Sequence, residues 1–377
     1  MSGAPDGSGP DGSGPDGTVA CGLATGSSRP PAELFDVALL DLDGVVYVGP
    51  DAVPGVPDGL ATARAAGMRL GFVTNNAARP PEEVAGHLSE LGVPATPDEV
   101  ITSSQAAASV VAAMLGPGAR VLPVGGPGVA AALRAAGLTV VDRAEDDPAA
   151  VVQGYGREVG WAQLAEAVVA VRRGARHVAT NADASIPSPR GPLPGNGAMV
   201  GVVRGVTGIE PLVTGKPDPA MHAECVRRTG ALRPLVVGDR LDTDIEGSRR
   251  AGAASLLVLS GVTDPATLLG AAPQHRPDLL APDARGLLVP HPPVVVGEAG
   301  WTCGGWVATA DGDGSLQLHA APGSAAGADA GAAGDGLDGL RALCVAAWSR
   351  AEGGPVRVRA GDGTAASALA GWDLGHP

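Results

Sequence analysis

Two acidic side chains, Asp41 and Asp43, stand at the end of an apolar run at 37–42. Gly44 follows them and permits a sharp turn of the chain, so that both carboxylates can face one ligand. Such a pair is able to act in catalysis. The same Asp-x-Asp-Gly pattern also occurs in ordinary turns and in calcium loops, so the pattern needs support from other parts of the chain.

A second acidic segment contains Asp239, Asp242 and Asp244 and follows an apolar run at 235–237. Carboxylates gathered at the end of a strand suit a hard cation with oxygen ligands. The alternative is the N-terminus of a helix, where acids interact favourably with the helix dipole. That alternative is sufficient to explain Asp242.

Thr74, Asn75 and Asn76 follow the apolar run at 70–73. A hydroxyl and backbone N–H groups in this position can hold phosphate oxygens. An ordinary helix cap by Thr or Asn is the alternative. These residues are therefore candidates for phosphate binding.

Lys216 is the only lysine among the 26 basic residues, and the residue after it, Pro217, suits the first position of a helix. A lone lysine is usually a solvated surface charge. In a chain that otherwise uses arginine, however, a retained compact ammonium fits a contact to phosphate. Lys216 therefore joins the candidates.

Secondary structure must position these side chains. From residue 35 onward, short apolar runs alternate with helix-like stretches, which predicts an α/β fold with a mainly parallel sheet. The strands end at the acidic and polar segments, as expected when the carboxyl ends of parallel strands carry a site. The first elements are expected as strands at 37–42, 70–73 and 101, and helices at 56–66, 81–91 and 103–115.

A further set of alternating elements at 117–205 predicts a second α/β domain, inserted into the first. Its expected strands are at 120–124, 138–141, 151–153 and 177–180, and its helices at 129–136 and 161–173. The first domain is expected to resume with strands at 212–213, 235–237 and 255–259 and helices at 217–228 and 243–251.

Both ends of the chain differ from this pattern. A Pro-Asp-Gly-Ser-Gly repeat at 3–18 has no apolar periodicity and predicts a disordered tail. Beyond a proline-rich stretch at 290–293, we expect a hairpin at 305–319, a helix at 337–349 and a strand at 356–359. These elements are too few for an independent core, so the tryptophans there are expected to bury the piece against the core or a second subunit.

Composition excludes several classes of protein. An apolar content of 45% in 377 residues fits a globular chain, and no apolar run is long enough to span a bilayer. A net charge of −14 argues against nucleic acid or an acidic membrane surface as partner. The four widely spaced cysteines predict free thiols, and with no secretory signal pattern the chain is expected to be cytoplasmic.

The motifs DLDG, TNN, GKP and GDRLDTD appear in the order and on the elements of the four motifs of the haloacid dehalogenase-like (HAD) superfamily. Over about residues 34–285 the chain resembles subfamily IIA, the 4-nitrophenyl-phosphatases and phosphoglycolate phosphatases. The resemblance implies a Rossmannoid core with a parallel sheet, an inserted α/β cap and a small C-terminal α+β extension. The expected bounds are a disordered tail at 1–33, a HAD core at 34–104 and 206–285, a cap at 105–205, and the extension at 295–377.

The resemblance also implies a Mg²⁺-dependent phosphomonoesterase. Asp41 is expected to be the nucleophile that becomes an aspartyl-phosphate, and Asp43 the general acid and base. The expected ligands of Mg²⁺ are Asp41, Asp239 and the backbone carbonyl of Asp43, with Asp244 behind them. Thr74, Asn75, Asn76 and Lys216 are expected to bind the substrate phosphate.

Substrate specificity is expected from a cap loop that runs from 181–183 to 194–197. Actinobacterial members with a C-terminal extension resemble glycerol-3-phosphate phosphatases, and their extension is similar to a fragment of a GNAT acetyltransferase. The chain matches this layout, so glycerol 3-phosphate is the expected substrate. Gly361-Asp362-Gly363 lacks the basic or amide residue of a pyrophosphate loop, which argues against acetyl transfer.

Two alternatives remain at this point. The first alternative to a glycerol-3-phosphate phosphatase is another small-molecule phosphatase, which acts on phosphoglycolate, a nucleotide or a sugar phosphate. The second is a non-catalytic phospho-aspartate sensor. Asp43 argues against the sensor, because a pure receiver needs no acid placed for a leaving alkoxide. A homo-oligomer is compatible with the sequence.

Overall fold

A computed structural model describes residues 22–186, 188, 190–321, 323, 334–349 and 353–374. The chain divides into two compact units. Unit 1 is Met1–Leu70 together with Leu232–Pro377, and unit 2 is Gly71–Ala231. We describe each unit by itself.

Unit 1 contains a parallel sheet in the order β15-β14-β13-β1. Its strands are almost entirely apolar and mostly buried, which is why they read as continuous hydrophobic runs. The strands are β1 (Val37–Leu40), β13 (Pro234–Gly238), β14 (Ala254–Val258) and β15 (Leu279–Ala281). The helices are α1 (Pro31–Leu34), α2 (Val56–Ala65), α9 (Glu246–Ala251) and α10 (Pro265–Leu269), and a hairpin joins β2 (Tyr47–Val48) to β3 (Asp51–Ala52).

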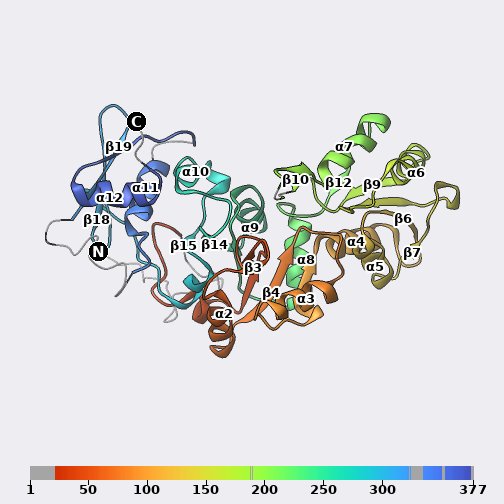
Figure 1. Ribbon diagram of the computed structural model, residues 1–377, viewed down its shortest axis with the longest axis horizontal. Helices are drawn as coiled ribbons and strands as arrows, with labels where there is room; N and C mark the ends of the chain where they lie inside the picture. The colour runs from red at the N-terminus through yellow and green to blue at the C-terminus, as the bar shows by residue number, and fades with distance from the viewer. Residues whose placement is uncertain are drawn as a thin grey trace, which may run out of the picture. The chain divides into compact units, whose positions relative to one another are not determined.

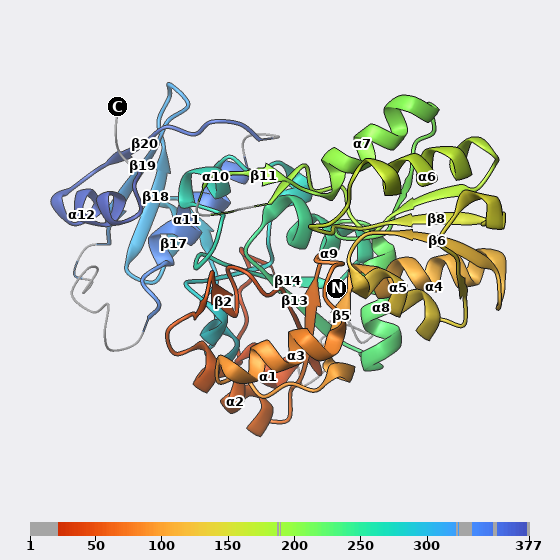
Figure 2. The same cartoon turned by 45° about the vertical axis from the view of Figure 1, so that its right-hand side comes forward.

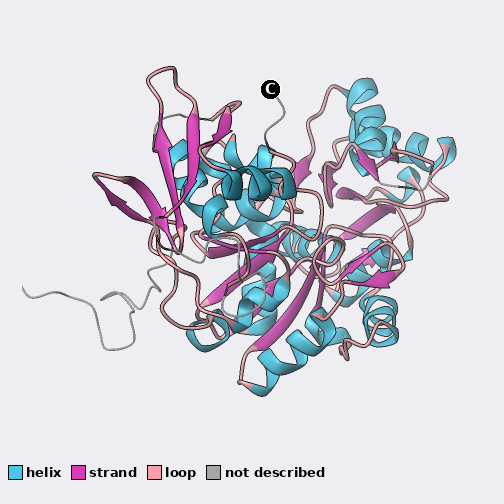
Figure 3. Cartoon of the chain, turned by 60° about the vertical axis from the view of Figure 1, so that its left-hand side comes forward, coloured by secondary structure: helices cyan, strands magenta, loops and turns pink. Residues whose placement is uncertain are grey.

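The C-terminal extension belongs to unit 1 and forms a five-stranded sheet in the order β16-β17-β18-β19-β20. Figure 3 draws strands in magenta and helices in cyan. Helix α11 contacts β17, β18 and β19, and α12 contacts β19 and β20. The pairings are antiparallel except for β19 with β20. The elements are β16 (Val295–Gly297), β17 (Gly300–Cys303), β18 (Trp306–Ala310), β19 (Leu316–Ala320), α11 (Asp338–Trp348), β20 (Val358–Ala360) and α12 (Gly363–Gly371).

The described residues of the extension share a hydrophobic cluster with the parallel sheet. One buried cluster contains Leu257 and Leu280 of the parallel sheet together with Leu316 and Leu343 of the extension. Trp348 donates its ring N–H to the carbonyl of Leu268 at 3.3 Å. The tryptophans were expected to bury the extension against the core or against a second subunit, and Trp348 contacts the core.

Unit 2 contains a second parallel sheet in the order β12-β9-β8-β6-β7. Helices α4 and α5 cover one face and α6 and α7 the other (Figure 1), and each face has its own hydrophobic cluster. The strands are β6 (Arg120–Val124), β7 (Thr139–Val140), β8 (Ala150–Gln153), β9 (Arg176–Ala179) and β12 (Leu212–Val213). The helices are α4 (Ser103–Leu115), α5 (Pro127–Ala135), α6 (Trp161–Arg172) and α7 (Asn196–Thr207).

The rest of unit 2 carries the phosphate-binding candidates. Strand β4 (Arg69–Thr74) starts at the end of unit 1 and pairs in parallel with β5 (Val100–Thr102) within unit 2. Helix α3 (Pro81–Glu90) lies between them in the chain, and α8 (Pro219–Thr229) packs against α4 (Figure 2). A hairpin of β10 (Ser185–Ile186) and β11 (Leu193–Pro194) completes the unit.

Two sequence expectations about element bounds are wrong. The strand at 212–213 does not resume the first domain, because β12 pairs with β9 of the inserted sheet, so the cap extends beyond residue 205. A two-residue edge strand carries no pattern that tells which sheet it joins. Pro217 is not the first helical residue, since Asp218 caps α8 and Pro219 follows it.

The predicted disordered tail at 1–33 is also too long. Among the described residues of this segment, Leu23 is buried, and Ser27 and His291 exchange backbone hydrogen bonds of 2.8 and 3.0 Å. A single leucine in a Gly/Ser-rich stretch is a weak signal, although it is enough to anchor the chain. The repeat at 3–18 lies outside the described residues.

No helix among the described residues has both the length and the apolar character needed to cross a bilayer. Cys225, Cys303 and Cys344 are buried free thiols, and Cys21 lies outside the described residues. Burial raises the pKa of Cys225 and of Cys303 to about 12, so these thiols stay protonated and unreactive at neutral pH.

Candidate functional site

Three carboxylates meet at the carboxyl end of the parallel sheet in unit 1. Asp41 follows β1 and Asp239 follows β13, and these strands are paired so that Leu40 lies opposite Val237. Asp244 lies on a π-helical turn, Leu241–Ile245, which is separated from the end of β13 by two residues. One oxygen from each of Asp41, Asp239 and Asp244 lies within 4.8 Å of the others, and Asp239 and Asp244 are each only 1% exposed.

Glycines make this close approach possible. A side chain at Gly44, where φ is +86°, would place its Cβ 2.4 Å from a carboxylate oxygen of Asp239, and one at Gly261 would come within 2.0 Å of the same oxygen. That oxygen accepts a hydrogen bond from the backbone N–H of Val262 at 2.7 Å. Glycine is therefore required at both positions to keep Asp239 in place.

The donor set fits a divalent cation. Carboxylate oxygens are the ligands that Mg²⁺ and Ca²⁺ prefer, and three negative charges this close together repel one another without a cation between them. Asp43 is exposed and does not belong to the cluster of three. Asp242 also lies apart from the cluster. Arg240 donates two hydrogen bonds to the Asp242 carboxylate and lowers its pKa. Asp242 lies in the first turn of the π-helical segment, as expected for an acid at the N-terminus of a helix.

The phosphate-binding candidates form a second group, within unit 2. Thr74 ends β4, and its hydroxyl oxygen accepts from the backbone N–H of Asn76 at 3.1 Å. Asn76 in turn accepts from the backbone N–H of Ala78 at 2.9 Å, as expected for a local cap. The ammonium of Lys216 donates to the carbonyl of Val73 at 3.3 Å. The structure therefore brings the TNN and GKP motifs together.

The side chain of Asn75 holds the main chain of Lys216 from both sides. The backbone N–H of Lys216 donates to Asn75 Oδ1 at 2.8 Å, and Asn75 Nδ2 donates to the Lys216 carbonyl at 3.2 Å. A Cβ at Gly215 would lie 2.2 Å from the carbonyl oxygen of Thr180 and 2.7 Å from Asn75 Oδ1. Only glycine fits there, and the Asn75 amide acts on Lys216 rather than pointing freely toward a ligand.

Sequence reasoning missed the partners of Asn75 in the inserted domain. Asn181 donates to the Asn75 carbonyl at 2.7 Å, and Asn75 donates to a carboxylate oxygen of Asp183 at 3.4 Å. The segment containing Asn181 and Asp183 was expected to set specificity, but not to contact Asn75. The rarity of asparagine, with only four in the chain, was the available signal.

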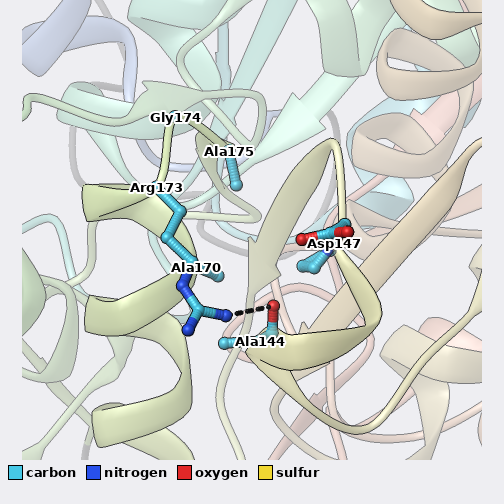
Figure 4. A pocket seen from close by; sticks show the side chains of 7 residues that line it. Ala144, Asp147, Ala170, Arg173, Gly174 and Ala175 are labelled. Carbon is cyan, nitrogen blue, oxygen red and sulfur yellow. Dashed lines mark hydrogen bonds between the residues drawn. The ribbon is translucent and has the colours of Figure 1, made fainter.

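A separate pocket of about 180 Å³ lies on the inserted domain, lined by residues of α6 and of the segments before β8 and β9 (Figure 4). Its one basic group, Arg173, donates to the carbonyl of Ala144 at 3.0 Å and pairs with Glu145 at 3.6 Å. The guanidinium is thus used by the fold, and the other ionisable side chain that lines the pocket is Asp147.

Comparison with known proteins decides the family. Haloacid dehalogenase-like hydrolase models match residues 38–139 and 213–287. D-glycerol 3-phosphate phosphatase of Mycobacterium tuberculosis is 43% identical over 350 residues, which cover 91% of this chain and 95% of that protein. The chain belongs to the haloacid dehalogenase-like hydrolases.

Other relatives of this HAD hydrolase are also phosphatases. Acid sugar phosphatase of Staphylococcus aureus is 38% identical over 227 residues, covering 60% of this chain and 86% of that protein. The crystal structure of the M. tuberculosis glycerol phosphate phosphatase in complex with magnesium has a TM-score of 0.80 and 43% identity, and covers 92% of this chain and 99% of that chain. The predicted family, fold class and enzyme class, a phosphoric monoester hydrolase, are confirmed.

The extension of the HAD hydrolase matches a GCN5-related N-acetyltransferase-like domain over residues 303–374, which confirms the predicted likeness. Asp362 caps α12, accepting from the backbone N–H groups of Ala365 and Ala320 at 2.8 Å each, and these hydrogen bonds lower its pKa. A carboxylate therefore occupies the N-terminus of α12, where an acid interacts favourably with the helix dipole.

Proposed function

We propose that this HAD hydrolase is a Mg²⁺-dependent phosphatase that hydrolyses glycerol 3-phosphate through an aspartyl-phosphate on Asp41. The observation that carries the proposal is the cluster of Asp41, Asp239 and Asp244 at the end of β1 and β13. A carboxylate that is held beside two buried acids suits a site where a cation offsets the charge of a phosphate.

Asp41, Asp239 and the carbonyl of Asp43 would hold Mg²⁺, with Asp244 supporting them. When bound, the ion supplies charge neutralisation for the phosphoryl oxygens. Asp239 and Asp244 are themselves held by the backbone N–H groups of Val262 and Arg240, at 2.7 and 3.2 Å. The acids are thus oriented before any ligand arrives, which limits reorganisation during the reaction.

The reaction follows from the roles of two side chains. Asp41 attacks phosphorus, the bond from phosphorus to the ester oxygen breaks, and Asp43 donates a proton to the leaving alkoxide. Asp43 then accepts a proton from water, whose oxygen attacks the acyl-phosphate and releases inorganic phosphate from Asp41. The exposure of Asp43 suits a group that must meet both substrate and water.

Thr74, Asn75, Asn76 and Lys216 would bind the phosphoryl oxygens through the Thr74 hydroxyl, the Lys216 ammonium and backbone N–H groups. A chain with a net charge of −14 needs such local cations for an anionic substrate. The Asn75 side chain contributes by holding the main chain of Lys216.

Glycerol 3-phosphate is favoured because the M. tuberculosis relative aligns over 91% of this chain, extension included, whereas the acid sugar phosphatase covers 60%. The acidic composition favours a small phosphorylated metabolite over nucleic acid or a membrane as partner. A cytoplasmic location and a possible homo-oligomer complete the proposal.

The test is phosphate release from glycerol 3-phosphate, phosphoglycolate, a sugar phosphate, a nucleoside monophosphate and 4-nitrophenyl phosphate, with Mg²⁺ or with EDTA. Wild type should turn over the first ester fastest, only with Mg²⁺, and Asp41→Asn should be inactive. Asp43→Asn should accept a phosphoryl group from an activated ester and release it slowly. No turnover of any ester, with Mg²⁺ binding intact, would favour the phospho-aspartate sensor instead.

A further inference from the structure

Three of the four asparagines in the 377-residue chain belong to one hydrogen-bonded series inside unit 2. Asn196, at the start of α7, donates to the carbonyl of Asn181 at 2.8 Å and to that of Gln153 at 3.2 Å. Asn181 donates to the carbonyl of Asn75 at 2.7 Å. The series therefore runs from the end of β8 to the loop that holds Lys216.

The series is buried. Asn181 is 3% exposed, Asn196 is 2% and Gln153 is 0%. A hydrogen bond in such surroundings is strengthened by the low dielectric, and a buried polar group that loses its partner costs roughly 1–3 kcal/mol. The geometry of each amide is therefore strongly constrained by its neighbours.

The backbone around Asn196 is shaped for this contact. A Cβ at Gly195 would lie 2.3 Å from the carbonyl oxygen of Asp183, and one at Gly197 would lie 2.3 Å from that of Ala182. Glycine on both sides lets the Asn196 segment press against the Asn181 segment. The two glycines of the Gly-Asn-Gly sequence are thus explained by the close approach of the two segments.

An amide is required at each position by the direction of the hydrogen bonds. In the three bonds of the series, a side-chain N–H₂ group donates to a backbone carbonyl. Aspartate has nearly the same shape, but its ionised oxygens cannot donate and would face carbonyl oxygens at these distances. Leucine has a similar size and no donor at all.

The far end of the series is incompletely paired. Within the described part of the chain, Gln153 Nε2, His177 Nδ1 and Asn196 Oδ1 are buried without a hydrogen-bond partner, while His177 Nε2 contacts Gln153 Oε1 at 3.0 Å. Buried polar atoms of this kind usually bind ordered water.

We propose that Asn181 and Asn196 are positioning residues for phosphate binding: they anchor the Asn75 loop to the interior of the inserted domain, and Asn75 in turn holds Lys216. The proposal rests on the proposed function and extends it. The inserted domain, expected to set substrate specificity, then also sets the geometry of the phosphate-binding residues.

The test compares wild type with Asn181→Leu and Asn196→Leu, and with Asn181→Asp and Asn196→Asp in case a leucine variant does not fold. We measure kcat and KM for glycerol 3-phosphate and for 4-nitrophenyl phosphate, and Ki for inorganic phosphate. A displacement of about 1 Å in a binding group costs roughly 10²-fold in rate. We expect kcat/KM to fall by that order for both esters and Ki for phosphate to rise.

Hydrogen exchange of the Lys216 amide gives a readout that does not need turnover. This N–H donates to Asn75 Oδ1, so it should be protected in wild type and exchange faster in each variant. Glu166→Ala is the matched control. The Glu166 carboxylate accepts a hydrogen bond from the backbone N–H of Ala144 at 2.7 Å, so the variant also removes a bond between a side chain and the main chain of unit 2, but outside the asparagine series. It should lower the melting temperature without changing Ki or exchange at Lys216.

Variants that melt earlier but keep the wild-type Ki and Lys216 protection would overturn the proposal, since the asparagines would then serve stability alone. A wild type that hydrolyses no ester would instead reject the proposed function. In that case, hydrogen exchange of the Lys216 amide would still test whether the asparagines position Lys216. Unchanged protection of this amide in Asn196→Leu would contradict the positioning role.

Discussion

At the scale of single residues, like charges are held together where a cation would bind. The oxygens of Asp41, Asp239 and Asp244 within 4.8 Å of one another raise the energy of the metal-free protein. Any ligand that offsets this repulsion stabilises the folded state by mass action. Metal binding should therefore be visible in unfolding experiments as well as in activity.

We expect Mg²⁺ at one hundred times its Kd to stabilise wild type by about 3 kcal/mol. Asp239→Asn should melt later than wild type in EDTA, because one charge is gone, and should gain less from Mg²⁺. Thermal melts with and without Mg²⁺ measure both effects. Asp242→Asn is the control, since Asp242 pairs with Arg240 outside the cluster. An equal gain from Mg²⁺ in wild type and Asp239→Asn would contradict the assignment.

His177 gives the protein a pH-dependent stability. Burial lowers its pKa from 6.5 to about 4, whereas the unfolded chain titrates near 6.5. Between these values the unfolded state binds more protons, so stability falls as the pH is lowered from about 6.5 to 4 and is unaffected by this group above 6.5.

Urea unfolding at pH 7.5 and pH 5 should show this loss for wild type and a smaller loss for His177→Gln, which cannot ionise. Some pH dependence should remain in the variant, because burial also lowers the pKa of His222 and of His291. Identical pH dependence in the two proteins would show that His177 does not contribute.

At the scale of elements, the loop between β12 and α8 depends on one glycine. A methyl group at Gly215 would meet the Thr180 carbonyl and the Asn75 amide, so Gly215→Ala must displace the Lys216 main chain. We expect a stability loss of about 1–3 kcal/mol from overpacking, together with a higher KM for the phosphate ester.

Gly205→Ala is the matched control for this substitution. Gly205 lies within α7, where an added Cβ meets nothing within 4 Å, so alanine should be neutral or stabilising by up to about 1 kcal/mol. Urea unfolding and Michaelis kinetics on both variants separate a general effect of alanine from the specific contact at Gly215.

Elements with a strong local signal could be predicted from the sequence. Buried apolar strands that end in Asp41 and Asp239 identified the parallel sheet and its acidic edge, because burial on both faces leaves a continuous hydrophobic run. The strand at 212–213 was assigned to the wrong sheet, since two residues specify no partner. Likewise β16 and β17 were missed, because they have only three and four residues and just one of these, Cys303, is buried.

Long-range contacts limited the prediction of the site. The motifs predicted roles for Asn75 and Lys216, but the two-sided hold of Asn75 on the Lys216 main chain joins residues 141 positions apart. No local pattern encodes such a pairing. The burial of Asn181 and Asn196 was equally invisible, and only the scarcity of asparagine in the composition pointed to them.

At the scale of the whole molecule, unit 1 joins the HAD sheet and the extension in one hydrophobic core. Arg341 of α11 is 1% exposed, forms ion pairs with Asp335 and Asp338, and donates to the carbonyl of Leu280 in β15. A buried cation thus ties the extension to the sheet that carries the acidic cluster. The two parts should unfold together.

Removing one partner of a buried ion pair costs roughly 3–5 kcal/mol, so Arg341→Met should be destabilised by that amount. Tryptophan fluorescence and loss of activity should follow a single shared transition in urea. Arg359→Met, which removes exposed pairs with Asp311 and Asp313, should cost about 1 kcal/mol or less. An extension that unfolds while activity persists would contradict a shared core.

The single lysine also has a practical consequence. Apart from the amino terminus, an amine-selective acylating reagent finds only one side chain to modify, the half-buried Lys216 whose ammonium contacts the Val73 carbonyl. Intact mass would then read the fraction of molecules modified at that residue without any mutation. Protection by added phosphate would titrate binding directly, in a protein that carries its own chemical reporter.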